Sequence, residues 1–498
     1  MGGGKEGLSL EIFGTVVSGG TLALLALCLA IALGFEFVNG FHDTANAVAT
    51  VIYTKSLKPG VAVVWSGIMN FFGVFFGTTV GGAAVAFGIV HLLPVDLLIQ
   101  MGQSVGLLMV LSLLLSAIIW NLGTWYFGLP SSSSHALIGS ILGVGVASSL
   151  LSGNGLGSGV NWAQAQKVGL SLLASPLFGF GVAAALLLLC KALIKDRRLY
   201  DEPKGDAPPP LWIRSLLFLT CTLVSFFHGS NDGQKGVGLI MLILIGILPA
   251  QFAVSDQINP AQMQETLAAV RRLEAKIAPA SAETAQTLAG IASTLASTEG
   301  VSALSSGQRT EVRAAVLRAD SALGKFEKEN PGAFGSPDEQ SAFKKDRKAL
   351  NRLTDFVAGW VPFAVALALG IGTMVGWKRI VVTVGEKIGK THLTYAQGAA
   401  AEIVAAATIY AADHLGLPVS TTHVLSSGIA GTMAANRSGL QGATIRNIAL
   451  AWVLTLPVTM LLAGSLFALT AGGAIRKQAS QATLILEPRL DRTKPLGN

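Results

Sequence analysis

Long apolar stretches separated by short polar loops occupy most of the chain. A helix needs about 20 mostly apolar residues to cross a membrane. Residues 97–166 contain no Asp, Glu, Lys or Arg, so this stretch alone holds more than one such helix. The pattern predicts an all-α polytopic membrane protein with roughly 10–12 membrane segments. The predicted segments are 21–38, 41–53, 61–90, 104–126, 131–151, 168–190, 215–231, 236–250, 357–376, 394–414, 421–435 and 447–471.

One stretch, residues 251–356, interrupts this pattern. Charges of both signs appear there, and Trp and Tyr are absent. Leu267, Val270 and Ile277 recur at the spacing of one face of a helix. We therefore expect a small soluble helical insert between membrane segments.

A motif that breaks the apolar pattern occurs twice, at Gly128–His135 and at Gly416–His423. Both copies begin Gly-Leu-Pro and end in hydroxyl residues followed by His. Proline cannot continue a preceding helix, and Ser or Thr after it is a favourable N-cap for a new one. Each copy therefore predicts a helix that begins inside the membrane, where free backbone N–H groups favour an anion.

A second motif is also duplicated, because Gly40–Asn46 aligns with Gly229–Lys235 through its Gly and Asp. The distance from this motif to the hydroxyl break is longer in the second half by nearly the length of the polar insert. The chain thus reads as two homologous membrane repeats. The expected divisions are 1–210 for the first repeat, 211–250 and 357–498 for the second repeat with a polar tail, and 251–356 for the insert.

The basic residues predict the orientation of the chain in the membrane. Lys and Arg gather at 191–214 and 378–390, which are therefore cytoplasmic, whereas the loops 91–103 and 152–167 carry a single Lys. With the basic loops on the cytoplasmic side, the second repeat crosses the membrane in the opposite direction to the first, and the insert lies outside. Inverted repeats with broken helices or re-entrant hairpins are typical of secondary transporters. The net charge of +7 then reflects orientation, and we expect no nucleic-acid partner.

Composition excludes several other classes of protein. With 51% hydrophobic and 13% charged residues, the chain is no soluble globular protein. The Ser and His of the breaks are neighbours in sequence, with no acidic residue to orient the His and no nucleophile elbow, so we expect no enzyme. The three Cys lie in apolar runs and predict no disulfide framework, and no cofactor is expected.

At these four motifs the sequence resembles the inorganic phosphate transporter (Pit) family of secondary carriers. The flanks Trp120–Trp125 and Thr394–Gly398 are similar to its bacterial low-affinity branch. The resemblance implies a multi-pass protein of the bacterial inner membrane that imports inorganic phosphate with a coupling ion. The family usually has Asn where His42 and Lys235 stand here. That departure favours a proton as the coupling ion, with sodium as the alternative.

Phosphate has four oxygens and one to two negative charges. Its site therefore needs many hydrogen-bond donors, but it must also be able to release the ion. Hydroxyls, amides and backbone N–H groups supply such bonds without a permanent positive charge. The alternative for membrane Ser and Thr is a bond to a carbonyl of their own helix. The predicted phosphate-binding residues are Ser132, Ser133, Ser134, Ser420, Thr421, Thr422, Asn46 and Gln234.

Asp43 and Asp232 are the predicted coupling residues. A carboxylate beside apolar runs costs several kcal/mol unless it is paired, protonated or bound to a cation. The alternative role is a structural ion pair or a helix cap. Lys235 either neutralises Asp232 or attracts phosphate. Further candidates for a role in transport are His42, His135, His423 and Glu402.

The sequence leaves other functions open. A carrier for sulfate would need the same hydroxyl clusters, and phosphate could enter as a complex with a divalent metal. A membrane receptor or sensor that works through the external insert is a third reading. A homodimer is compatible with the pattern but is not specified by it.

Overall fold

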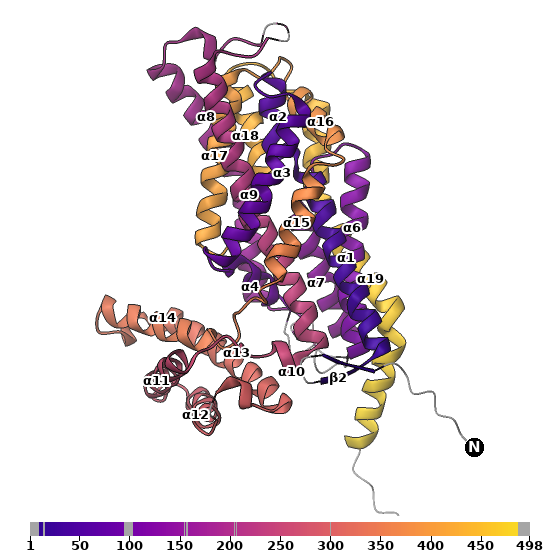
Figure 1. Cartoon of the computed structure of the whole chain (residues 1–498), viewed down its shortest axis with the longest axis vertical. Coiled ribbons are helices and arrows are strands. Elements are labelled where there is room, and N and C mark those ends of the chain that lie inside the picture. The colour runs from indigo at the N-terminus through magenta and orange to yellow at the C-terminus, as the bar shows by residue number, and fades with distance from the viewer. Residues whose placement is uncertain are drawn as a thin grey trace, which may run out of the picture.

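The computed structural model describes residues 9–12, 15–93, 103–153, 155, 158–203, 205, 207–298 and 300–486. A bundle of long helices stands on a smaller group of helices at one end (Figure 1). The expected all-α fold is confirmed for the membrane part. One addition is a short antiparallel hairpin of β1 (Ser9–Ile12) and β2 (Thr15–Ser18) before the first helix.

The membrane part consists of helices, most of which overlap the predicted segments, whereas α16 lies where a basic loop was expected. Their bounds are α1 (Gly19–Asp43), α2 (Ala45–Tyr53), α3 (Pro59–Thr79), α4 (Ala84–Val90), α6 (Gln103–Tyr126), α7 (Ser133–Leu151), α8 (Trp162–Leu193), α9 (Leu211–Ile247), α15 (Val361–Thr373), α16 (Lys378–Glu386), α17 (Tyr395–His414), α18 (Thr421–Ala435) and α19 (Gly442–Leu486). Much of the predicted loop 91–103, and the tail beyond 486, lie outside the described residues.

Among the described residues, seven helices are long and apolar enough to cross a membrane, or eight if α15 and α16, bent by 65°, form one span. The chain is thus a multi-pass membrane protein. The number is below the roughly 10–12 segments expected, because several segments are too short to cross alone. Helix α18, for example, has 15 residues, and α1 with α2 counts as one span.

Two predicted helix boundaries are wrong in instructive ways. Helix α9 runs for 37 residues straight through the second Asp motif, where the sequence predicted an interruption at 231–236. Nothing in that motif prevents a helix, since it contains no Pro. Conversely, the predicted segment 61–90 divides into α3 and α4 near Gly82, whose φ of 82° is a left-handed conformation.

The two hydroxyl breaks lie between paired helices, α6 with α7 and α17 with α18. Gly128 and Gly416 both have left-handed backbones, with φ of 66° and 62°, which let the chain turn after the first helix of each pair. The new helices start as predicted, with Ser132 and Ser420 as N-caps that accept from the backbone N–H of His135 and His423. Each break therefore presents a helix N-terminus within the bundle.

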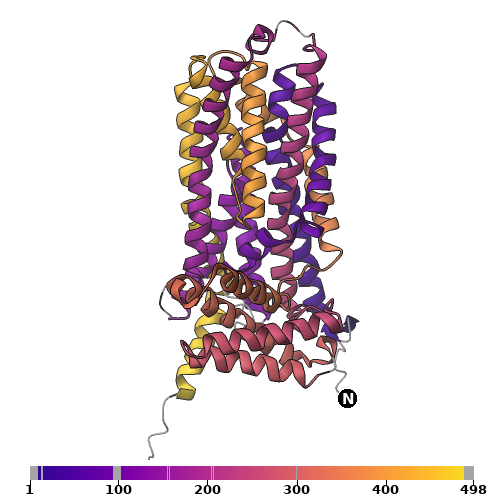
Figure 2. The ribbon, with the colours of Figure 1, turned by 90° about the vertical axis from the view of Figure 1, so that its left-hand side faces the viewer.

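The polar stretch forms α10 (Pro249–Phe252), α11 (Pro260–Ile277), α12 (Ala282–Ala296), α13 (Ser306–Glu329) and α14 (Pro337–Asn351). These helices have an apolar core of their own, with Val270, Leu288 and Leu323 fully buried. Arg313 of α13 joins the two connections to the membrane part, because its Nη1 donates to the carbonyls of Ala253 and Thr354. The insert lies at the opposite end of the bundle from α16 and the α8–α9 loop (Figures 1 and 2).

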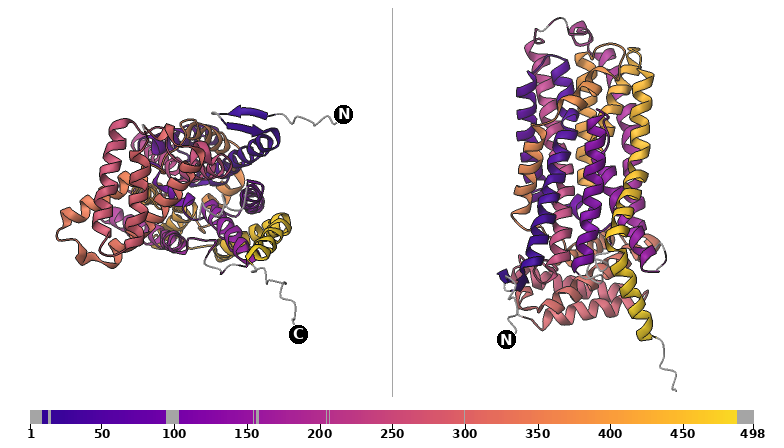
Figure 3. Two further views of the ribbon diagram at one scale, coloured as in Figure 1. Left: turned by 90° about the horizontal axis from the view of Figure 1, so that it is seen from below. Right: turned by 90° about the vertical axis from the view of Figure 1, so that its right-hand side faces the viewer.

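That arrangement agrees with the orientation expected from Lys and Arg, since both basic loops lie far from the insert. The β1–β2 hairpin and the far end of α19 lie at the insert end as well (Figure 3). The proposal that this end faces outward leads to a labelling prediction.

Cysteine introduced at Ser321, an exposed residue of α13, should react with an impermeant thiol reagent added to intact cells. The matched control is Asp201→Cys in the loop after α8, which is also exposed and should react only after the membrane is opened. Both variants need a background without Cys28, Cys190 and Cys221. The reverse labelling pattern would contradict the orientation.

Candidate substrate and ion site

The two hydroxyl breaks, Gly128–His135 and Gly416–His423, form the tips of the two helix pairs, and these tips meet inside the bundle. Ser134 at the start of α7 donates its hydroxyl to the carbonyl of Val419, just before α18, at 3.2 Å. The rings of His135 and His423 lie 4.6 Å apart. Residues that are almost 300 positions apart in sequence therefore line one small volume, and all of these side chains are buried.

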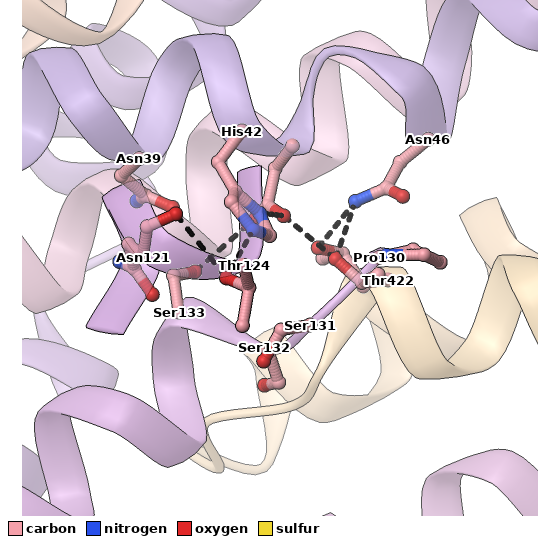
Figure 4. A network of polar contacts seen from close by, with 12 residues as sticks. Asn39, His42, Asn46, Asn121, Thr124, Pro130, Ser131, Ser132, Ser133 and Thr422 are labelled. Carbon is pink, nitrogen blue, oxygen red and sulfur yellow. Dashed lines mark hydrogen bonds and ion pairs between the residues drawn. The ribbon is translucent and has the colours of Figure 1, made fainter. Parts of the chain in front are cut away.

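Asp43, the last residue of α1, lies at the centre of this volume. Its Oδ2 accepts from the Ser133 hydroxyl at 2.8 Å, and its Oδ1 accepts from the Thr422 hydroxyl at 2.7 Å. The ring nitrogen Nδ1 of His42 lies 3.1 Å from the same Oδ1, and its Nε2 lies 3.1 Å from Thr124 (Figure 4). One carboxylate thus collects hydroxyls from both breaks.

Asn46, the second residue of α2, lies beside the same hydroxyls. Its amide Nδ2 donates to Thr421 at 3.2 Å and to Thr422 at 3.0 Å, as Figure 4 shows for Thr422. Its Oδ1 has no hydrogen-bond partner among the described residues, although it is buried. The Nδ2 of Asn46 is thus engaged by both Thr hydroxyls, whereas its Oδ1 is open to a ligand that donates a hydrogen bond.

Lys235 and Asp232 form a buried ion pair on α9. The Nζ of Lys235 lies 2.6 Å from Asp232 Oδ1, and it also donates to Ser134 at 2.5 Å and to the Val419 carbonyl at 3.1 Å. The three donors of the ammonium are therefore occupied. Of the two roles considered for Lys235, this geometry favours neutralisation of Asp232, and it adds a contact to both breaks.

His228 of α9 also lies at this centre. Its Nε2 lies 3.6 Å from Asp232 and 3.9 Å from Asp43. Ligand atoms of Asp43, His228 and Asp232 all lie within 4.8 Å of one another, so the three could hold a cation. Two carboxylates and an imidazole suit a divalent transition metal better than sodium. His228 has no counterpart in the first motif, because Asn39 occupies the matching position there.

The structure does not bring every predicted residue to this centre. Gln234 accepts from the backbone N–H of Val85 at 3.0 Å and donates to Asp413 at 2.9 Å. Glu402 is buried elsewhere and accepts from Thr50 and Thr220.

The remaining predicted side chains lie beside the tips. His135 Nδ1 lies 2.8 Å from the hydroxyl of Ser132, and the ring of His423 stacks on Trp452 at 4.1 Å. Ser420 caps α18. These contacts hold the tips in place, so Ser132 and Ser420 are engaged by their own helices.

The Lys235 pair gives a stability prediction. Lys235→Met should lower the melting temperature of the purified protein, because loss of one partner of a buried ion pair costs about 3–5 kcal/mol. Asp232→Asn combined with Lys235→Met removes both charges and should recover most of that loss. Melting curves in detergent test this. If Lys235→Met alone were as stable as the wild type, the ion pair would contribute nothing to the stability of the fold.

Comparison with known proteins identifies the family of this chain. The model of the phosphate transporter family matches residues 39–463. The low-affinity inorganic phosphate transporter PitB of Escherichia coli K12 is 43% identical over 485 residues, covering 89% of this chain and 96% of that protein. The probable low-affinity inorganic phosphate transporter of Bacillus subtilis 168 is 29% identical and covers 88% of this chain and 94% of its own.

A solved structure, the sodium-dependent phosphate transporter, matches with a TM-score of 0.55 at 18% identity, over 90% of this chain and 98% of that one. This likeness concerns the fold. The family match spans both Asp motifs and both hydroxyl breaks. The chain therefore belongs to the phosphate transporter family.

Proposed function

We propose that this protein imports inorganic phosphate together with a proton by alternating access, as a symporter of the bacterial inner membrane. The relatives that it matches over most of their length are phosphate transporters. One structural observation carries the proposal. Hydroxyls from opposite halves, Ser133 and Thr422, donate to a single carboxylate, Asp43.

The centre has the donors that phosphate needs. Each tip begins a helix, so the N–H groups of its first turn point toward the meeting point of α7 and α18. The hydroxyls of Ser133, Thr421 and Thr422 and the amide of Asn46 lie around the same point. A ligand held by neutral donors from two movable tips can be bound tightly and still released.

Asp43 explains why phosphate and a proton should bind together. As a carboxylate it takes the hydroxyls of Ser133 and Thr422, and it repels an anion placed beside them. A proton on Asp43 removes the charge and weakens its hold on both hydroxyls. Phosphate can then accept those hydrogen bonds, so each ligand favours binding of the other.

The surroundings of Asp232 favour a proton over sodium. The ammonium of Lys235 lies 2.6 Å from this carboxylate, where it would repel a bound cation. A second form of the substrate, a neutral complex of phosphate with a divalent metal, is supported by the cluster of Asp43, His228 and Asp232. In that form the metal would be cargo and would need to displace Lys235 from Asp232.

The test is counterflow and accumulation of labelled phosphate in proteoliposomes. We expect accumulation to follow an imposed proton gradient, inside alkaline, and to be unaffected by a sodium gradient. Sulfate in excess should compete poorly. Accumulation that follows sodium alone would overturn the proton proposal, and accumulation abolished by a chelator would favour the metal complex.

Deletion of the insert separates a carrier from a sensor. The backbone N–H of Ser255 donates to the carbonyl of Leu353 at 2.9 Å, so a short Gly-Ser linker can replace 256–352 without moving the ends apart. A carrier should keep measurable phosphate uptake after this deletion. Complete loss of uptake in a variant that still reaches the membrane would show that the insert is essential to the function.

A further inference from the structure

Glu36 is a buried carboxyl that the transport scheme above does not use. It lies in α1, two helical turns before Asp43, and 0% of its surface is exposed. Asp43 is at the end of α1 where α2 begins, so Glu36 lies between the binding centre and the end of α1 that carries the β hairpin. A carboxyl in a membrane-spanning helix is costly unless it is paired or holds a proton.

The contacts of Glu36 provide no cation and little hydrogen bonding. Its Oε2 accepts from Asn39 at a long 3.5 Å, and its Oε1 has no hydrogen-bond partner among the described residues. The side chain packs against Gly236 of α9, where a Cβ atom would lie 2.4 Å from its Cδ and 2.5 Å from its Oε1. The glycine thus leaves room for the carboxyl group of Glu36 against α9.

Within the described part of the chain, no unpaired basic residue on the helices around Glu36 is available to neutralise a carboxylate at this position. Helix α9, which packs on α1, carries His228, Asp232 and Lys235 in its second Asp motif, and α1 itself carries His42 and Asp43. Lys235 is already paired with Asp232. Helices α6 and α15, which also pack on α1, contain no Asp, Glu, Lys, Arg or His, and α7 contributes only His135. The formal charges of Asp43, Asp232 and Lys235 sum to one negative charge, so these residues offer no net positive charge to a carboxylate at Glu36.

Polar atoms continue from Glu36 toward Asp43. Asn39 Oδ1 and both amide atoms of Asn121 are buried without a hydrogen-bond partner among the described residues. Figure 4 shows Asn39 and Asn121 on the same side of Thr124 and His42. His42 bonds to Thr124 and to Asp43. Buried polar groups in such a row suit water molecules that conduct protons.

We propose that Glu36 is the residue that takes up the coupling proton before it reaches Asp43. This inference rests on the proposed proton symport. A proton leaves the Glu36 carboxyl and moves along the polar row to the Asp43 carboxylate as phosphate binds. The Glu36 carboxylate then regains a proton from the outer aqueous phase. The charge stays balanced, because one proton enters the row for each proton delivered to Asp43.

Glu36→Gln tests this, because it keeps the shape and the neutral state but cannot carry a proton. Wild type and variant are reconstituted with an internal pH-sensitive dye. We expect the variant to keep phosphate counterflow within about twofold of wild type and to lose at least about tenfold in accumulation and in phosphate-driven proton entry, a factor equivalent to 1.4 kcal/mol. Glu36→Asp, which still titrates, should recover part of the proton entry.

The outcomes separate the inference from the proposed function. If wild type itself shows no proton entry with phosphate, the proton symport and the role of Glu36 both fail. If wild type is coupled and Glu36→Gln is equally coupled, only the role of Glu36 is overturned. Loss of counterflow in both Glu36 variants would likewise overturn it, because the residue would then serve binding or folding.

Discussion

Replacing Asp43 by Asn should lower proton-driven phosphate uptake about a hundredfold or more, the largest single effect that the structure predicts. The change keeps the size of the side chain but removes the charge and the titratable group. Ser133, Thr422 and His42 all lose their charged partner at once. The tips can still approach phosphate, so exchange of phosphate should be reduced far less than accumulation.

Initial rates of labelled phosphate uptake across a pH series measure this effect. The matched control is Asp196→Asn, a carboxylate in the loop after α8 that interacts with Arg198 at the surface. It should transport as wild type does. Normal accumulation by the Asp43 variant at every pH would show that Asp43 has no part in coupling.

The second large effect is expected when both tips lose a hydroxyl. Ser133→Ala or Thr422→Ala alone removes one bond to a charged group, which costs on the order of 1.5–3 kcal/mol, or roughly ten- to hundredfold in affinity. The double variant should be almost inactive, since Asp43 then has no hydroxyl donor from either tip. Thr421→Ala, at the position equivalent to Ser133, should also weaken uptake because Thr421 binds Asn46.

The same two helices provide controls for these substitutions. Ser140 in α7 and Thr432 in α18 are buried hydroxyls that bond only to carbonyls of their own helices, those of Ala136 and Ile429. Ser140→Ala and Thr432→Ala should leave uptake within about twofold of wild type. If the controls fail as badly as the tip variants, packing rather than ligand binding explains the losses.

Hydropathy and helix-breaking residues predicted much of the fold. The Pro-hydroxyl motif determined where α7 and α18 begin, because proline stops one helix and the following Ser caps the next. The polar composition of 251–356 predicted the separate helical insert. These features are local in sequence, which is why they could be inferred without a structure.

Other features depend on how distant helices face one another. Asp232 and Lys235 share one face of α9, whereas Gln234 projects from a different face and reaches Asp413 instead. Because α9 is continuous, its second Asp motif follows helical periodicity rather than the broken geometry predicted for it. The bonds of His228 to α3 and of Glu402 to α2 and α9 likewise follow from packing, not from sequence spacing.

The two repeats also meet less symmetrically than their sequences indicate. Ser133 and Thr421 occupy equivalent positions, yet it is Ser133 and Thr422 that donate to Asp43. Asp43 is a single carboxylate between the two tips, so it accepts hydrogen bonds from positions that are not equivalent in the two copies of the motif. Inversion of the second repeat relative to the first remains a prediction from the charge pattern.

The most direct test of a shared site is equilibrium binding of labelled phosphate to the purified protein. Two variants are compared with wild type, one with Ser132, Ser133 and Ser134 changed to Ala and one with Ser420, Thr421 and Thr422 changed to Ala. We expect each to weaken phosphate binding at least about a hundredfold, because each removes donors from one tip. Wild-type affinity in the second variant, with binding lost in the first, would contradict the shared site and place phosphate in the first half alone.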